Sequence, residues 1–196
     1  MVKMGKKDEV DLSVDDVDRI LACAKAKRQR DYLVLALMAK GGLRLAEVVG
    51  SADKRLTERG LLPGLYVEDL RPGGVKVNGK KSRYYGGPYV VVQPLPVDLL
   101  AELQAFAPKK GKIFIMDPSR VQQLVHEYAK AASIPDWGKI HPHRLRHSYI
   151  TRIARKVGRD PFKVRDLARH KALATTARYV ADLPLDEKAE IVNQTF

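Results

Sequence analysis

The first regular pattern along the chain is an apolar stripe with helical spacing. The stripe consists of Val14, Val17, Ile20, Leu21 and Ala24. Ser13 precedes it and Asp16 follows three positions later, a pairing that satisfies the free amide groups at the start of a helix. We therefore expect a helix that begins after Ser13 and buries one face. Cys23, the single cysteine, falls within this helix and is predicted to be a small core residue.

The following stretch is apolar on all sides rather than on one. Residues 30–40, "RDYLVLALMAK", predict a helix buried at the centre of the fold. Gly41 and Gly42 end this helix, and residues 43–50 predict another one with Arg44 in its first turn. Residues 50–64 are polar and contain glycine and proline, which predicts a surface loop.

Strand patterns appear in the middle of the chain. Residues 65–70, "LYVEDL", predict a short strand, and residues 74–96 place a β-forming run on each side of turn residues. The second pattern predicts a hairpin with Gly86, Gly87 and Pro88 near its tip. Helical spacing then returns at 97–106, 119–132, 143–157, 161–169 and in a last amphipathic segment that carries Leu185, Ala189 and Val192. The expected fold is mainly α (α+β), with a small antiparallel sheet.

The charge of the chain is strongly positive and unevenly distributed. Its 36 Lys and Arg against 23 Asp and Glu give a net charge of +13. Residues 139–179 hold twelve Lys and Arg and two acids, so this stretch alone contributes +10. A one-sided basic run inside a helical pattern favours a polyanionic partner, most often a nucleic acid.

Two classes of protein are disfavoured by the sequence. No apolar run approaches the roughly 20 residues that span a bilayer, and residues 1–10 lack the apolar core of a signal peptide. A single cysteine allows neither an internal disulfide framework nor a metal cluster built on cysteines. We therefore expect a cytoplasmic protein without a membrane partner.

Candidate chemistry is concentrated in the decapeptide "HPHRLRHSYI", residues 141–150. His143 and Arg146 are three positions apart and share one face of a helix, which suits either an anionic ligand or a solvated basic surface. His141 and Arg144 have the same spacing, so the local pattern does not choose between the two pairs.

Several segments together resemble the tyrosine recombinase (phage integrase) family. In chain order they are "GGLRLAEV", "VKVNGKKSR", "PHRLRHSYIT" and "DLARHKALATTARYV". The resemblance runs from about residue 12 to residue 180, and it aligns Arg44, His143, Arg146, His170 and Tyr179 with the family's catalytic residues. It implies the family's helical catalytic domain, with a hairpin that carries a catalytic lysine.

That lysine is open between two neighbours. The hairpin motif points to Lys80, which follows a glycine, but the motif's second glycine is missing, so Lys81 stays an alternative. Adjacent residues of a strand face opposite sides, and only one of the two should reach a phosphate. A further departure from the family pattern is Arg169, which stands where the family has a glycine.

The resemblance implies DNA cleavage by a tyrosine, with no cofactor, metal or ATP. Tyr179 would attack a phosphodiester and form a 3′-phosphotyrosyl bond, while the lysine protonates the departing 5′ oxygen. Arg44 and Arg146 would hold the phosphate oxygens with their guanidinium groups. His143 and His170 would add hydrogen bonds, and one of them would help to take the tyrosine proton.

The leading hypothesis is therefore a site-specific recombinase or integrase that acts on double-stranded DNA. Self-association as a tetramer on paired DNA sites is expected, with a monomer in the absence of DNA. Nicking and closing like that of type IB topoisomerases, and a DNA-binding module that does not cut, are the alternatives. Should Tyr179 not be the nucleophile, Tyr149 and Tyr128 are the next candidates. Further DNA contacts are expected from Arg144, Arg152, Arg155, Lys171 and Arg178.

The chain is expected to have three parts. Residues 1–12 form a charged lead-in, residues 13–183 the catalytic domain and residues 184–196 a tail helix. The tail carries an apolar stripe that must be buried, either on its own domain or on a neighbouring protomer. The sequence indicates neither the DNA target, nor the direction of the reaction, nor whether the tyrosine cuts in its own active site.

Overall fold

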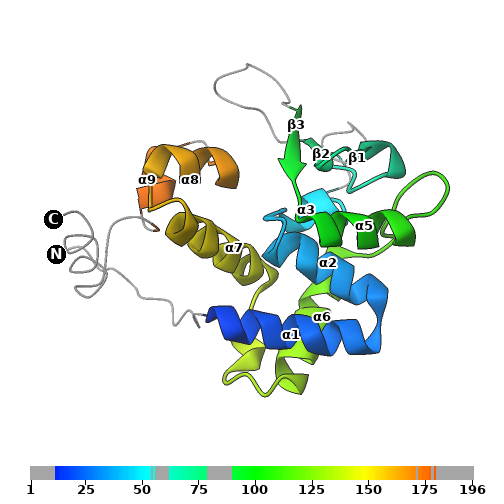
Figure 1. Cartoon of the computed structure of the whole chain (residues 1–196). Coiled ribbons are helices and arrows are strands. Elements are labelled where there is room, and N and C mark those ends of the chain that lie inside the picture. Colours follow the sequence, from blue (N-terminus) through cyan, green and yellow to red (C-terminus); the bar gives the residue numbers. More distant parts are fainter. Residues whose placement is uncertain are drawn as a thin grey trace, which may run out of the picture. The chain divides into compact units, whose positions relative to one another are not determined.

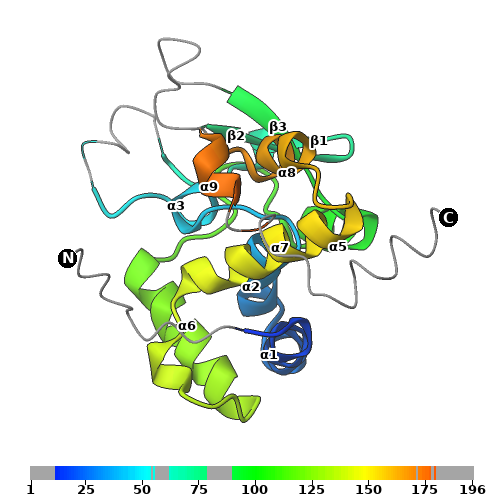
Figure 2. The same ribbon diagram turned by 90° about the vertical axis from the view of Figure 1, so that its left-hand side faces the viewer.

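The computed structural model describes residues 12–53, 55, 62–78, 90–170, 172–177 and 179. The chain divides into two units, residues 1–149 and 150–196. Figure 1 labels the elements along the chain, and Figure 2 shows them from a second direction. The division falls inside helix α7 (Pro142–Lys156), which therefore begins in the first unit and ends in the second.

Helix α2 (Gln29–Ala39) lies at the centre of the first unit. Every residue from Asp31 to Ala39 is buried, as the apolar run predicts. Around α2 pack α1 (Val14–Lys27), α3 (Leu45–Val48), α5 (Val97–Phe106) and α6 (Pro118–Ala131). The predicted capping box of α1 is present, and Cys23 is half-buried against the core. Within the described residues, the predicted loop at 50–64 is partly internal, because Gly50, Leu62 and Gly64 are buried.

A small antiparallel sheet completes the first unit, in the order β1-β2-β3. Its strands are β1 (Leu70–Arg71), β2 (Gly74–Asn78) and β3 (Val90–Pro94). Strands β2 and β3 form the predicted hairpin, with Val75 opposite Gln93 and Val77 opposite Val91. The expected tip at 86–88 lies outside the described residues.

The prediction of a strand over residues 65–70 is wrong for Val67–Asp69, which form a 3-10 turn. Before this turn Tyr66 forms an isolated antiparallel β-bridge with Lys112, and after it Leu70 begins strand β1. The cause is a side chain, since the carboxylate of Asp69 accepts a hydrogen bond from the backbone N–H of Tyr66 at 3.0 Å. This local bond closes the turn in competition with a strand ladder.

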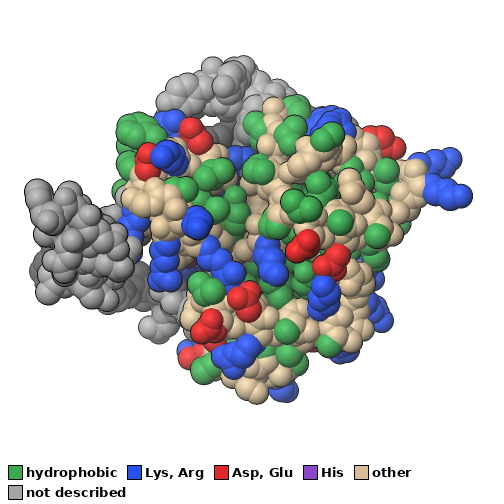
Figure 3. Space-filling view, viewed as in Figure 1, with side chains coloured by type: hydrophobic (Ala, Val, Ile, Leu, Met, Phe, Trp, Pro, Cys, Tyr) green, Lys and Arg blue, Asp and Glu red, His purple; other side chains and the backbone are tan. Residues whose placement is uncertain are grey.

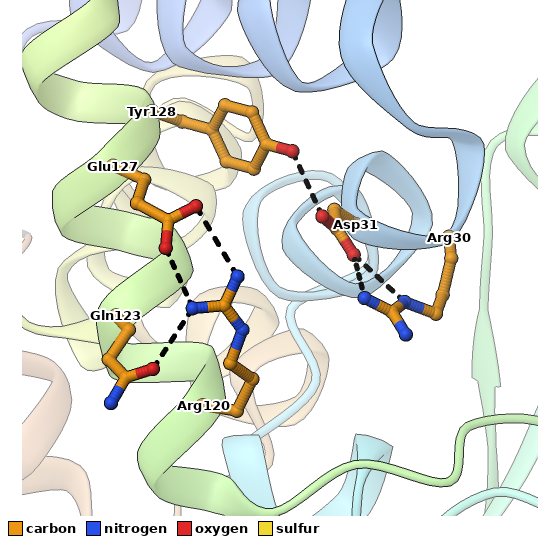
Figure 4. Close-up of polar contacts among 6 residues, drawn as sticks. All are labelled: Arg30, Asp31, Arg120, Gln123, Glu127 and Tyr128. Atoms are coloured by element: carbon orange, nitrogen blue, oxygen red, sulfur yellow. Dashed lines mark hydrogen bonds and ion pairs between the residues drawn. The ribbon is translucent and has the colours of Figure 1, made fainter.

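Helices α2 and α6 are joined by a buried polar contact (Figure 4). The hydroxyl of Tyr128 donates to the carboxylate of Asp31 at 2.9 Å, and both side chains are buried. Arg30 forms an ion pair with the same carboxylate at 2.8 Å. Burial and the hydrogen bond to Asp31 raise the pKa of Tyr128 to about 12. Nearer the start of α6, Arg120 pairs with Glu127 at 2.7 Å and also bonds Gln123.

The C-terminal helices follow the sequence pattern closely. Helix α8 (Pro161–Ala168) begins at the predicted proline, with Asp160 as its N-cap. The short helix α9 (Leu173–Ala177) was not predicted, and the expected helix around Leu185, Ala189 and Val192 lies outside the described residues. The fold is mostly helical with a three-stranded antiparallel sheet, which confirms the predicted class. No helix in the described part of the chain is long and apolar enough to cross a membrane.

Candidate active site

Arg44 is the N-cap of α3, directly before the first turn, in which the sequence predicts it. Its guanidinium forms an ion pair with Glu47 at 2.9 Å, and its backbone N–H donates to the same carboxylate at 2.7 Å. The side chain of Glu47 is 2% exposed and that of Arg44 is 38% exposed. The buried carboxylate therefore holds the guanidinium at the protein surface, where an anion can reach it.

The other end of α3 is held by a lysine from a distant loop. The ammonium group of Lys112 donates to the carbonyl of Val49 at 2.8 Å, just past the last residue of the helix. A cation at a helix C-terminus interacts favourably with the unpaired carbonyls there. Burial lowers the pKa of Lys112. A helix of only four residues is thus fixed at both ends, and Arg44 gains a defined position.

Arg146 is the largest fully buried side chain in the described part of the chain, with 1% exposure. It lies on α7, and its guanidinium donates a hydrogen bond to the carbonyl of Gly42. A buried charge is tolerated only where hydrogen bonds or ion pairs compensate it. Because Gly42 precedes Arg44 by two residues, the structure attaches both predicted arginines to the same turn. This pair of fixed cations is the first part of the candidate site.

The rest of α7 is basic. His143 is exposed in the first turn, Arg144 and His147 are half-buried, and Arg155 is exposed near the end. The helix carries five Lys and Arg and no acid, and blue side chains gather over it in Figure 3. An acid-free helix face of this kind suits a phosphate backbone.

In the second unit, helix α8 ends at the unusual Arg169. This residue adopts φ 55 and ψ 44, in the left-handed region, and its N–H bonds the carbonyls of Arg165 and Asp166. Glycine is favoured at such helix ends because it lacks the Cβ that strains this conformation. The family's glycine at this position therefore has a conformational reason, and here Arg169 adopts the same type of cap.

His170 follows this cap and is oriented by a neighbour. Its Nδ1 lies 3.0 Å from the hydroxyl of Thr176, which is fully buried on α9. The backbone N–H of Tyr179 donates to the carbonyl of Thr176 at 2.9 Å. The rings of His170 and Tyr179 are 5.8 Å apart between centroids, with 31° between their planes. Thr176 thus holds the two predicted residues side by side, a role that the sequence pattern does not indicate.

The predicted site residues lie in several parts of the chain. Arg44 and Arg146 share the Gly42 turn in the first unit, and His170 and Tyr179 lie together in the second. His143 is exposed on α7, one turn before Arg146. Lys80, Lys81, Lys171 and Arg178 lie outside the described residues.

The two alternative nucleophiles, Tyr149 and Tyr128, are 7% and 2% exposed, and their hydroxyl groups bond Gln93 and Asp31. In the described residues, no group of three or more His, Cys, Asp or Glu side chains could hold a metal ion.

Comparison with known proteins identifies a family for the chain. The profile of the phage integrase family matches residues 104–185. A tyrosine recombinase of Pseudothermotoga lettingae is 32% identical over 182 residues, which are 86% of this chain and 54% of that protein. The chain spans about half the length of the curated relatives it matches.

Solved structures share the fold at low identity. The integrase of transposon Tn1549, in complex with transposon right end DNA, has a TM-score of 0.68 and 16% identity, over 98% of this chain and 68% of that one. The catalytic domain of bacteriophage HP1 integrase has a TM-score of 0.60 and 18% identity, over 93% of both chains. With the sequence boxes, the arginine pair and these matches, the chain belongs to the tyrosine recombinase (phage integrase) family.

Proposed function

We propose that this chain is the catalytic domain of a site-specific recombinase that cleaves and rejoins double-stranded DNA through a 3′-phosphotyrosyl intermediate. The observation that carries the proposal is the pair of fixed cations, Arg44 and Arg146, on the Gly42 turn. Two guanidinium groups that stay charged at any working pH can neutralise the charge that builds up on a phosphate under attack. The proposed reaction therefore runs without a metal ion or ATP.

The chemical step exchanges one phosphate ester for another. The hydroxyl oxygen of Tyr179 attacks the phosphorus, its proton passes to a base, and the bond from phosphorus to the 5′ oxygen breaks. Lys80, or Lys81 in its place, gives a proton to the 5′ oxygen, so that a DNA hydroxyl leaves. His170 is the proposed acceptor of the tyrosine proton, supported by the 5.8 Å between the centroids of its ring and that of Tyr179. Attack by the 5′ hydroxyl of a partner strand reverses these steps and reseals the DNA.

Exposure favours Tyr179 as the nucleophile over the two alternatives. Tyr179 is partly exposed, whereas Tyr149 and Tyr128 are buried and their hydroxyl groups are already bonded inside the first unit. Either hydroxyl group would have to give up the hydrogen bond that it makes inside the first unit before it could attack a phosphate. These hydrogen bonds thus support the assignment that the family boxes imply.

DNA is the proposed partner, and the basic face of α7 is the proposed point of contact. The relatives of known structure include an integrase bound to DNA, which is consistent with this choice. Contacts from Arg144, Arg152 and Arg155 to phosphates should make binding steeply dependent on salt, because each contact releases counterions. A tetramer on paired sites is proposed for strand exchange, with the tail at 184–196 as a candidate contact between protomers.

The decisive experiment traps the covalent intermediate. The protein is incubated, with EDTA present, with a pool of randomised duplexes that carry a nick beside each potential cleavage site, so that the short cleaved strand diffuses away. We expect a covalent adduct on a DNA 3′ end in the wild type and none in Tyr179→Phe. Sequencing the captured DNA gives the target site and the polarity of cleavage.

Matched variants separate the alternatives. Tyr66→Phe, on a half-exposed tyrosine of the first unit, should form the adduct like the wild type. A supercoiled plasmid relaxed without exchange between two captured sites would indicate nicking and closing instead. DNA binding with no adduct at any site would contradict the proposed chemistry and leave a binding module.

A further inference from the structure

Gly42 is a junction at which three parts of the first unit meet. Its carbonyl accepts the hydrogen bond of Arg146, and Arg44 follows two residues later. Its Cα lies against the ring of Tyr149, so closely that a Cβ added to Gly42 would overlap that ring. The glycine has φ +65, a conformation in which a side chain is strained in any case. The ring of Tyr149 therefore rests directly on the backbone that carries the arginine pair.

Tyr149 is itself fixed by the sheet. Its hydroxyl accepts a hydrogen bond from the side-chain amide of Gln93 at 3.2 Å, and the two side chains are 7% and 1% exposed. Gln93 lies on β3, opposite Val75. Two residues along, Leu95 packs against Gly41, where an added Cβ would lie 2.5 Å from the leucine side chain. Strand β3 thus acts on the Gly41–Gly42 turn through the bond of Gln93 to Tyr149, and Leu95, which directly follows the strand, packs against the same turn.

We propose that Tyr149 and Gln93 are positioning residues for the arginine pair. Their hydrogen bond sets how closely the Tyr149 ring approaches Gly42. The position of Gly42 in turn sets where its carbonyl accepts the hydrogen bond of Arg146 and where Arg44 lies. Neither residue touches DNA in this assignment, which rests on the proposed cleavage reaction. Displacing catalytic groups by about 1 Å can cost 100-fold in rate, so a contact one layer away can control catalysis.

A double-mutant cycle tests the contact. Tyr149→Phe removes the hydroxyl, Gln93→Met removes the amide, and the double variant replaces a buried polar pair with an apolar pair of similar shape. Such a paired replacement is often nearly neutral for stability, although each single variant leaves a buried group without this partner. The double variant should therefore be as stable as the wild type. The readouts are the single-turnover rate of adduct formation on a captured DNA site, the Kd for that DNA and the unfolding midpoint.

We expect both single variants and the stable double variant to form the adduct about 10- to 100-fold more slowly, with Kd unchanged. The double variant should be no slower than the slower single variant, because both changes remove one contact. Tyr128→Phe is the matched control: it also removes a buried hydroxyl from the first unit, but away from the Gly42 turn, and should leave the rate unchanged. A double variant that cleaves at the wild-type rate, or a control that is equally slow, would overturn the proposal.

A change of substrate identifies which catalytic group is displaced. In a methylphosphonate, a methyl group replaces one non-bridging oxygen of the scissile phosphate, so less negative charge remains for the guanidinium groups to neutralise. The loss of cleavage rate in Tyr149→Phe, relative to the wild type, should be smaller on this substrate. The loss should stay the same on a substrate with a 5′-thio leaving group, which needs little protonation. The opposite result would mean that the contact serves the lysine rather than the arginines, and the assignment would fall. Wild-type protein that forms no adduct would instead contradict the proposed function itself.

Discussion

The two units of the chain are built from different amounts of apolar packing. The hydrophobic core extends from Val17 to Leu145 and contains large side chains such as Ile20, Leu33 and Phe114. In the described part of the second unit the buried residues are Ile150, Ala154, Val164, Ala168 and Thr176. Burying a leucine or phenylalanine contributes about 1.5–3 kcal/mol, and burying an alanine much less. Among the described residues, the arginine pair thus belongs to the unit with many large buried apolar side chains, and the tyrosine to the unit with few.

This difference in packing fits the different roles that we propose for the arginine pair and for the tyrosine. Fixed cations act best when they need no rearrangement during the reaction, which favours a rigid surrounding. A nucleophile that must approach a phosphate, leave it again and reseal the DNA gains from a segment that moves at low cost. Segments with few buried apolar contacts open locally with a small free energy. We therefore expect His170 and Tyr179 to lie in the least stable part of the described chain.

The largest expected effect is in amide hydrogen exchange. Amides of α2 should exchange only through global unfolding, while those of α8 and α9 should exchange through local opening, at least about 1000-fold faster. Mass spectrometry of peptides that cover 31–39 and 161–177 measures both rates. Similar protection in the two peptides would show that the second unit is stabilised as strongly as the first.

Two glycines with similar backbone angles sharpen the same comparison. Gly42 and Gly158 have φ +65 and +62, but an added Cβ overlaps Tyr149 at Gly42 and meets nothing within 4 Å at Gly158. An alanine in this conformation costs about 1–2 kcal/mol, and overpacking adds about 1–3 kcal/mol. Gly42→Ala should therefore lower the unfolding free energy about twice as much as Gly158→Ala. Urea unfolding followed by the fluorescence of Trp137, the single tryptophan, and by circular dichroism compares them.

Tyr128 gives the first unit a stability that depends on pH (Figure 4). Since its pKa is raised to about 12, the protonated phenol contributes its full stability below pH 10 and loses it between about pH 10 and 12. Tyr128→Phe should cost about 1–3 kcal/mol at neutral pH, because the Asp31 carboxylate loses one donor. The difference between the unfolding midpoints of the wild type and of Tyr128→Phe should decrease as the pH rises above 10. A gap that is constant from pH 8 to 12 would show that Tyr128 does not ionise in this range.

Local signals in the sequence account for most of the fold. Ser13 and Asp160 accept hydrogen bonds from amide groups of the first turn, and these caps fixed the predicted starts of α1 and α8. The prediction for residues 65–70 went wrong because a local hydrogen bond was not foreseen. The apolar residues of this segment predict a strand, whereas the 3-10 turn is closed by one hydrogen bond from the backbone of Tyr66 to the Asp69 side chain.

The sequence proposes the candidate site as a set of residues but not as a geometry. The family boxes selected Arg44, Arg146, His170 and Tyr179, which the structure brings together in pairs. The contacts that orient them join residues far apart in the chain, such as Arg146 and Gly42, 104 positions apart. Periodicity and capping describe neighbours along a helix and carry no information on such contacts. The choice between Lys80 and Lys81 stays a prediction, because both lie outside the described residues.

The smallest expected effect concerns the N-cap of α8. The carboxylate of Asp160 accepts hydrogen bonds from the N–H groups of Phe162 and Lys163 at 2.9 and 3.1 Å, and these bonds, first that of Lys163, lower its pKa. Asp160→Ala should speed amide exchange in α8 about fivefold, the usual effect of losing such a cap, and leave α2 unchanged. Ser13→Ala removes the corresponding cap of α1, where the hydroxyl accepts from the N–H of Asp16 at 3.1 Å, and is the matched variant in the first unit.

Measurements at low pH distinguish the loss of this N-cap from any other effect of Asp160→Ala. Because the pKa of Asp160 is lowered in the folded chain, its cap contributes stability above the ordinary pKa and loses it as the pH falls through the lowered value. The difference between wild type and Asp160→Ala should therefore vanish in strong acid. If Asp160→Ala instead speeds exchange in α2 as much as in α8, the two units unfold together. The tyrosine would then share the stability of the arginine pair, and its position in a lightly packed unit would have no dynamic consequence.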